Sequence, residues 1–100
     1  MREADPFAAL GDPNRRAIVR SLADGEKSVQ EIANEMTISR PAVSRHLRVL
    51  KSAGLVEVRP DGVRNLYSLD SAGVDDVRAF MEETWGTAVA RFRLFVDNTD

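Results

Sequence analysis

The chain has 100 residues, of which 43% are hydrophobic and 30% are charged, and its formal net charge is −2. This length predicts a single domain, residues 1–100, with one modest core. No apolar run approaches the roughly 20 residues that span a bilayer, and Met1–Pro6 has no apolar h-region, so neither a membrane segment nor a signal peptide is expected. Because the chain has no cysteine, disulfides and thiolate metal sites are excluded, and the cytoplasm is the expected location.

The N-terminal part carries two helix starts of the same design. Asp5-Pro6 and Asp12-Pro13 each place an N-cap carboxylate before a proline at the first helical position. The first start predicts a short helix that stops at Gly11. The second predicts a helix with an apolar stripe that ends at about Ala23.

Residues 28–54 carry the pattern of a helix-turn-helix. Ser28 and Glu31 form a capping-box signature, which opens a first helix. A three-residue turn, Thr37–Ser39, supplies the N-cap of a second helix, which stops at Gly54. Since this motif lays its second helix in the major groove of DNA, the pattern predicts a DNA-binding protein.

Two segments of alternating apolar and polar residues follow the helix-turn-helix. Leu55–Arg59 and Arg64–Leu69 are predicted strands, and Asp61-Gly62 between them is a strong hairpin-turn signal. The hairpin would form a wing over about residues 59–65. The predicted fold is therefore mainly α with a small β-hairpin (α+β), a winged helix-turn-helix.

The last predicted helix begins at Asp70 or Ser71 and continues to about Val96, with Gly86 as a point where it can bend. Its apolar residues recur at steps of three and four on one face. Their aromatic side chains need more covering surface than so small a domain offers, and such faces mark association. We therefore expect a homodimer, with burial inside one chain as the alternative. The predicted interface residues are Phe7, Leu10, Met81, Trp85, Val89, Phe92 and Phe95.

The second helix of the motif, residues 40–53, is amphipathic. Val43, Leu47 and Leu50 recur at i, i+4 and i+7 and are expected to face the core, which leaves a basic and polar arc outside. Side chains near the N-terminal end of a recognition helix approach base edges, and those further along meet phosphates. An ordinary solvated face is the alternative interpretation. The predicted base-reading residues are Arg40, Pro41, Ser44 and Arg45, and the predicted phosphate contacts include Arg48 and Lys51.

The predicted wing adds further basic residues. Arg59 and Arg64 suit the minor groove or the flanking backbone, whereas ordinary strand-edge charge is the competing explanation. Residues 39–64 hold six cationic and two anionic side chains, a local net charge of +4. His46 is predicted as a packed or capping imidazole first and as a phosphate contact second.

Catalysis and metal binding find no support in the residue pattern. Ser44 and His46 are two positions apart on one helix and do not face each other. The chain has no Gly-rich phosphate loop and no cluster of His, Asp and Glu with metal-ligand spacing. We expect neither a catalytic site, nor a metal, nor a cofactor.

Three segments, Leu10–Ile18, Ser39–Val56 and Asp61–Leu69, together resemble the ArsR/SmtB family of bacterial winged-helix repressors. The resemblance implies a homodimer, formed through the first and last helices, that binds an operator at the nucleoid and blocks transcription. It also implies that Arg40, Pro41, Ser44 and Arg45 face the major groove. Metal-sensing members carry Cys before the turn, or His and acidic pairs on the last helix, and this chain has neither Cys nor a His there.

The sequence therefore predicts a dimeric, sequence-specific DNA-binding transcriptional regulator, a repressor of a palindromic operator in double-stranded DNA. A winged-helix protein-interaction module is one alternative, but it would more often show apolar residues on the outer face of the recognition helix. A small-ligand or metal-sensing repressor with an atypical site is the other, and it leaves an unidentified small-molecule effector open as a partner.

Overall fold

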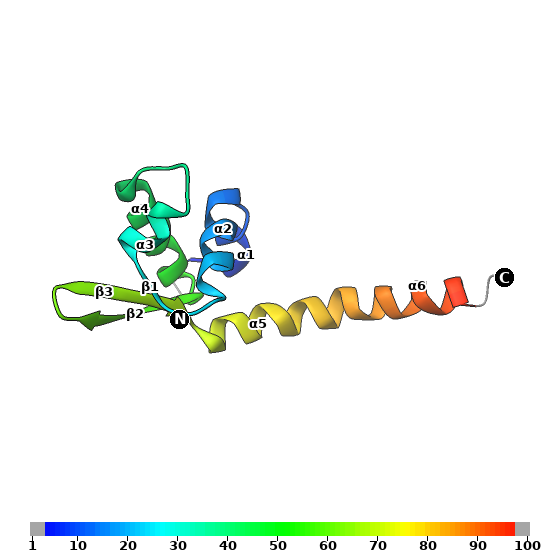
Figure 1. Ribbon diagram of the computed structural model, residues 1–100. Coiled ribbons are helices and arrows are strands. Elements are labelled where there is room, and N and C mark those ends of the chain that lie inside the picture. Colours follow the sequence, from blue (N-terminus) through cyan, green and yellow to red (C-terminus); the bar gives the residue numbers. More distant parts are fainter. Residues whose placement is uncertain (1–3, 98–100) are drawn as a thin grey trace.

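The computed structural model describes residues 4–97, with side chains described except at Val89 and residues 95–97. In chain order the elements are α1 (Pro6–Ala9), α2 (Pro13–Leu22), β1 (Lys27–Ser28), α3 (Val29–Asn34), α4 (Arg40–Ser52), β2 (Val56–Asp61), β3 (Arg64–Leu69), α5 (Ser71–Met81), a π-helical turn η1 (Glu82–Gly86) and α6 (Thr87–Asp97). Helices α1 to α4 gather on one side of the hairpin, and α5 to α6 extend away from this body as one rod (Figure 1). The radius of gyration, 16.7 Å, exceeds the about 13 Å of a compact chain of this length because of the rod.

The core lies where α2, α3 and α4 meet the base of the sheet. Its most completely buried large side chains, each at most 1% exposed, are Ile18, Ile32, Val43, Leu47 and Leu50. Val43, Leu47 and Leu50 lie on the recognition helix, and their burial confirms its predicted inward face. Burial of such aliphatic side chains contributes about 1.5–3 kcal/mol each to the folded state, so the core fixes which face of α4 points outward.

Local hydrogen bonds at the helix starts confirm the predicted caps. Asp12 accepts from the backbone N–H of Asn14 at 2.8 Å, and Asp70, the residue before α5, accepts from Ala72 at 3.1 Å. Ser28 and Glu31 form a complete capping box at α3. Each cap satisfies backbone N–H donors that a helix cannot satisfy itself. Because the cap and these donors are close in sequence, the helix starts can be predicted from neighbouring residues alone.

The predicted three-residue turn of the helix-turn-helix is wrong in length. Helix α3 ends at Asn34, so five residues, Glu35–Ser39, connect it to α4. The N–H groups of Glu35 and Met36 donate to the carbonyls three residues back, at 3.0 and 3.1 Å, and this tighter pattern ends the α-helix early. Ile38 still packs against the core, as expected for the turn residue between the two helices.

A third strand joins the predicted hairpin. The sheet order is β1-β3-β2, all antiparallel, with Lys27 opposite Tyr67 and Ser28 opposite Leu66. Two residues carry no periodic signal, and β1 exists because β3 offers its free edge to it. This strand ties the start of the helix-turn-helix to the wing.

The hairpin loop is shorter than predicted, because β2 continues to Asp61 whereas the predicted strand ends at Arg59. Asp61 pairs with Arg64, so the two central residues of the turn are Gly62 and Val63. Gly62 has φ +62°, the left-handed region that glycine enters without steric cost, and glycine at the first central position suits a tight hairpin. Val63 is fully exposed at the tip of the wing.

The long C-terminal helix is interrupted by the π-helical turn η1. The Thr84 hydroxyl donates to the Phe80 carbonyl at 2.8 Å, and such side-chain bonds compete with the backbone ladder of the helix. At the body, the rings of Phe7 and Phe80 lie with centroids 4.8 Å apart, which anchors α5 to α1. No helix within residues 4–97 is long and apolar enough to cross a membrane.

Candidate nucleic-acid interface

Helix α4 presents a polar and basic arc on the side opposite its buried face. Ser39 caps the helix by accepting from the Ala42 N–H at 3.2 Å, and Pro41 occupies the first turn, where its missing N–H leaves no bond unmade. Ser44 is half-buried on this arc. The exposed residues of the arc are Arg40, Pro41, Arg45, Arg48 and Lys51.

Three cations of this arc have no anionic partner in the part of the chain that the structure describes. Arg45, Arg48 and Lys51 form no ion pair there, whereas Lys27 and Arg78 each lie within 3.5 Å of a carboxylate oxygen. Arg40 has one contact, from its Nη1 to the Gln30 Oε1 at 3.5 Å. The outer face of α4 therefore carries positive charge that no carboxylate of the described residues neutralises.

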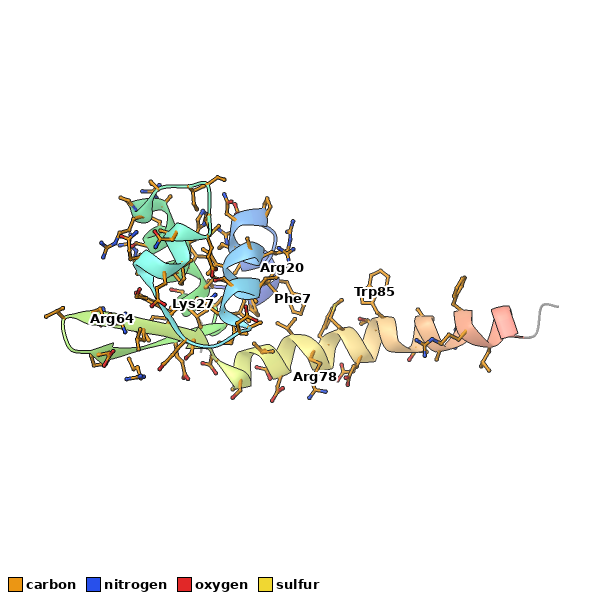
Figure 2. The ribbon with its side chains drawn as sticks, viewed as in Figure 1. Phe7, Arg20, Lys27, Arg64, Arg78 and Trp85 are labelled. Carbon is orange, nitrogen blue, oxygen red and sulfur yellow. The ribbon has the colours of Figure 1, made fainter. Side chains whose placement is uncertain are left out.

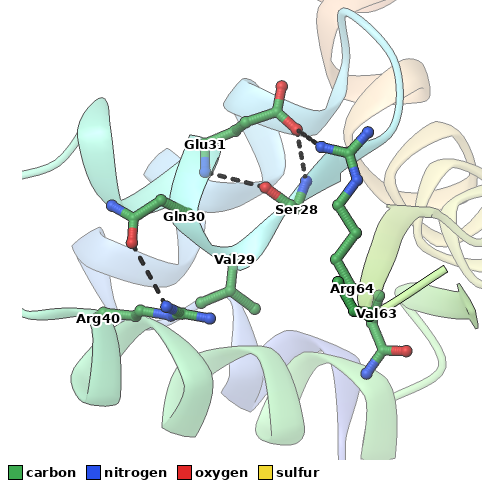
Figure 3. A pocket seen from close by; sticks show the side chains of 8 residues that line it. Ser28, Val29, Gln30, Glu31, Arg40, Val63 and Arg64 are labelled. Atoms are coloured by element: carbon green, nitrogen blue, oxygen red, sulfur yellow. Dashed lines mark hydrogen bonds and ion pairs between the residues drawn. The ribbon is translucent and has the colours of Figure 1, made fainter. Parts of the chain in front are cut away.

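A hollow of about 400 Å³ separates the start of the recognition helix from the wing (Figure 3). Arg40 and Arg64 approach it from opposite sides, with the capping box of α3 between them. The start of α4 and the wing thus border the same concave surface. The lining residues are Ser28, Val29, Gln30, Glu31, Arg40, Val63, Arg64 and Asn65.

The two wing arginines differ from those of α4 because both are paired. Arg59 donates two hydrogen bonds to Glu26, from Nε at 2.9 Å and from Nη2 at 2.5 Å, and this contact holds the pKa of Glu26 below its ordinary value. Arg64 lies 3.5 Å from Glu31 and 3.4 Å from Asp61. The sequence gives no signal for the first pair, since its partners are 33 residues apart.

His46 lies half-buried on α4, against α2. Its Nδ1 is 3.4 Å from the Nη1 of Arg15, whose Nε donates to the Ala9 carbonyl at 2.6 Å. Because a guanidinium only donates, Nδ1 is the acceptor where this contact forms a hydrogen bond. Arg15 therefore links the end of α1 to the recognition helix through His46.

The residues predicted for a dimer interface fall into three groups. Phe7, Met81, Trp85 and Phe92 are exposed, the last two at 61% and 67%, and Trp85 lies on the rod well clear of the body (Figure 2). Leu10 is half-buried against the core. The side chains of Val89 and Phe95 lie outside those that the structure describes. Phe80 and Leu94, which are not among the predicted interface residues, are also exposed, at 46% and 63%.

Two features would indicate a metal site: ligand side chains grouped within the described residues, and cysteine at the start of α3, where metal-sensing ArsR/SmtB proteins carry it. Within this range the structure places no three His, Cys, Asp or Glu side chains so that they could hold a metal ion. The start of α3 carries Ser28, Val29 and Gln30, none of which is a cysteine.

The recognition helix, the preceding helix and turn, and the wing define a winged helix-turn-helix protein, and the predicted fold class is confirmed. The model of bacterial regulatory proteins of the arsR family matches residues 12–58. Together with the relatives described next, this match shows that the chain belongs to the ArsR family of bacterial regulatory proteins.

Two curated relatives match over most of their own length. The HTH-type transcriptional regulator Rv2034 of Mycobacterium tuberculosis is 44% identical over 92 residues, which cover 92% of this chain and 86% of that protein. The transcriptional repressor SdpR of Bacillus subtilis is 36% identical over 70 residues, which cover 70% of this chain and 78% of that protein. The relatives are transcriptional regulators rather than enzymes.

Solved structures extend the likeness to the whole architecture. A structure described as a possible transcriptional regulator for arsenical resistance has a TM-score of 0.77 and 38% identity, covering 96% of this chain and 98% of that one. The homodimeric winged helix-turn-helix DNA-binding domain Mb0332 of Mycobacterium bovis has a TM-score of 0.67 and 32% identity, covering 80% of this chain and 74% of that one.

Proposed function

We propose that this protein is a sequence-specific DNA-binding repressor that acts in the cytoplasm as a homodimer on a palindromic operator. The observation that carries the proposal is the outer arc of α4, where Arg45, Arg48 and Lys51 are exposed and form no ion pair within the described residues. DNA supplies the missing counter-charge as phosphates. The name of the relative SdpR, a transcriptional repressor, favours repression over activation.

The proposed contacts divide along α4 by distance from its N-terminus. Near the start, Arg40 and Arg45 are suited to bidentate contact with guanine, and Ser44 donates to or accepts from a base edge. Pro41 meets a thymine methyl. Further along, Arg48 and Lys51 bind phosphates, which fixes the register of the helix without reading sequence. Arg59 and Arg64 supply the proposed wing contacts. His46 supplies a further proposed phosphate contact, through Nε2.

The proposed dimer uses α1 together with the rod of α5 and α6. Phe80, Trp85 and Phe92 leave large aromatic surfaces in water, which burial against a second copy would remove. A two-fold dimer of this kind would place its recognition helices about 34–36 Å apart on one side of the duplex. The homodimeric structure of Mb0332 supports this assembly.

Selection of bound duplexes from a random pool tests the proposal. The expected result is an inverted repeat whose half-site centres lie about one helical turn apart. Arg45→Ala should lose preference at one base pair in each half-site, and Arg20→Ala, a change at an exposed arginine of α2, should select the wild-type sequence. Recovery of no shared sequence with the wild-type protein would refute sequence-specific binding.

A further inference from the structure

Both cations of the wing, Arg59 and Arg64, form ion pairs with carboxylates, whereas Arg45, Arg48 and Lys51 on the recognition helix form none with the described residues. Arg59 and Arg64 are more than half exposed, with side-chain exposures of 56% and 55%. Their partners include Glu26 in the loop between α2 and β1 and Glu31 on α3, both in the body of the protein. These ion pairs tie the wing to the body, and the pair of Arg64 and Glu31 lies in the hollow between the wing and the start of α4.

The pair between Arg59 and Glu26 has the more definite geometry. The guanidinium presents Nε and Nη2 to the two carboxylate oxygens, the fork-to-fork arrangement that an arginine also adopts on a phosphate. Two of its five donors are therefore engaged in the form that a phosphate contact needs. Arg59 lies opposite Leu66 in the hairpin, so the backbone that carries it is fixed by strand pairing.

We infer that Glu26 is an intramolecular counterion for Arg59, so that this carboxylate and a DNA phosphate compete for the same guanidinium. Glu31, assisted by Asp61, does the same for Arg64. In this arrangement the wing contributes little to DNA affinity until its arginines leave the protein carboxylates and bind DNA phosphates. The inference rests on the proposed function because DNA is the competing anion.

Glu26 and a DNA phosphate compete for Arg59 on nearly equal terms. An exposed ion pair contributes little to stability, because water and salt screen it and two long side chains must be ordered. The contact with Arg59 keeps the pKa of Glu26 low, so the counterion is present throughout the neutral range. Loss of such a partner should therefore tighten DNA binding about two- to fivefold rather than by orders of magnitude.

Glu26→Gln is the direct test, and Glu57→Gln is its matched control. Glu57 lies two residues before Arg59 on β2 and therefore on the same face of the sheet, and it forms no ion pair within residues 4–97. Both changes remove one negative charge, but only the first releases Arg59. Affinity for a labelled duplex of arbitrary sequence and for the selected operator is measured from low to moderate salt. Glu26→Gln should bind about two- to fivefold tighter, with a salt slope steeper by about one unit, and Glu57→Gln should leave the slope unchanged.

Arg59→Gln completes a double-mutant cycle. It should cost little affinity in the wild-type protein and several-fold more in the Glu26→Gln background, because only there is Arg59 available to a phosphate. Equal costs in the two backgrounds, equal gains from Glu26→Gln and Glu57→Gln, or weaker binding by Glu26→Gln would overturn the inference.

Failure of the proposed function gives a different result. If the wild-type protein binds all duplexes alike and Arg45→Ala changes nothing, sequence-specific regulation is refuted. The salt slope on duplex of arbitrary sequence still reports whether Glu26 restrains Arg59.

Discussion

Gly73, in the first turn of α5, lies directly against the backbone of Gly54, two residues beyond the end of the recognition helix. A Cβ atom built on Gly73 would lie 1.7 Å from the Gly54 carbonyl oxygen and 2.6 Å from its carbonyl carbon. The contact is backbone against backbone, so no side chain can move aside to relieve it. It sets how α5 leaves the body, and through the rod it would set the distance between recognition helices in the proposed dimer.

Gly73→Ala should therefore lower the free energy of unfolding by about 1–3 kcal/mol, the usual cost of forcing extra volume into a packed site. The expected fall in Tm is about 4–8 °C per kcal/mol for a domain of this size, measured by thermal denaturation. Gly86→Ala is the control, because a Cβ there would meet only the Glu82 Cβ, at 3.9 Å. Equal Tm values for the two variants would contradict the close approach.

Lys51→Ala should weaken DNA binding on every sequence to the same degree. Lys51 lies in the last turn of α4, where side chains meet phosphates rather than base edges. The slope of log K against log salt should fall by about one unit, measured by fluorescence anisotropy. Arg45→Ala should instead cost about 1–3 kcal/mol on the operator and much less on unrelated DNA. Identical losses on both duplexes would show that Arg45 contacts DNA phosphates instead of base edges.

Trp85→Ala should weaken the proposed dimer by tenfold or more, because buried tryptophans commonly contribute 2 kcal/mol or more to an interface. Sedimentation equilibrium gives the dimer Kd. Arg93→Ala, a change at an exposed charged residue of α6, is the control and should leave the Kd near its wild-type value. An unaltered Kd for Trp85→Ala would place the interface elsewhere.

Stability should decrease in acid. Hydrogen bonds from Lys27 and Ser21 lower the pKa of Glu35 below its ordinary value of 4.5. A carboxyl with a depressed folded-state pKa stabilises the folded state above its unfolded pKa, and this contribution disappears as the pH falls through the folded pKa. The free energy of unfolding should therefore be level near neutrality and fall from about pH 5 downward, measured by urea denaturation.

Glu35→Gln should make that acid-induced fall shallower, since one of the linked carboxyls is gone. The pKa values of Asp12, Glu26 and Glu31 are also lowered, so part of the fall should remain. Glu83→Gln, a change at an exposed residue of η1, should reproduce the wild-type curve. A curve for Glu35→Gln that matches wild type would show that its contacts add nothing to stability.

Features that depend on near neighbours in the chain were predictable. The caps at Asp12, Ser28 and Ser39 are bonds to N–H groups two or three residues away. The buried face of α4 follows from a spacing that the helix itself imposes. The exposed arc of the recognition helix therefore follows from sequence, although its roles toward DNA stay predictions.

Features that depend on distant partners were not predictable. Strand β1 has two residues and exists only beside β3. Strand β2 runs two residues beyond its predicted end, because pairing across the hairpin continues to Asp61 and Arg64. The counterion Glu26 is 33 residues from Arg59, a separation that no local pattern bridges.

The amino-acid sequence by itself determined where the helices start, their caps and the identity of the side chains on the outer face of α4, because these depend on interactions within one or two helical turns. The tertiary structure decided which cations have partners. Within residues 4–97 it leaves Arg45, Arg48 and Lys51 of α4 without an ion pair and pairs both arginines of the wing with carboxylates. Charge pairing depends on distances through space that only the folded chain defines.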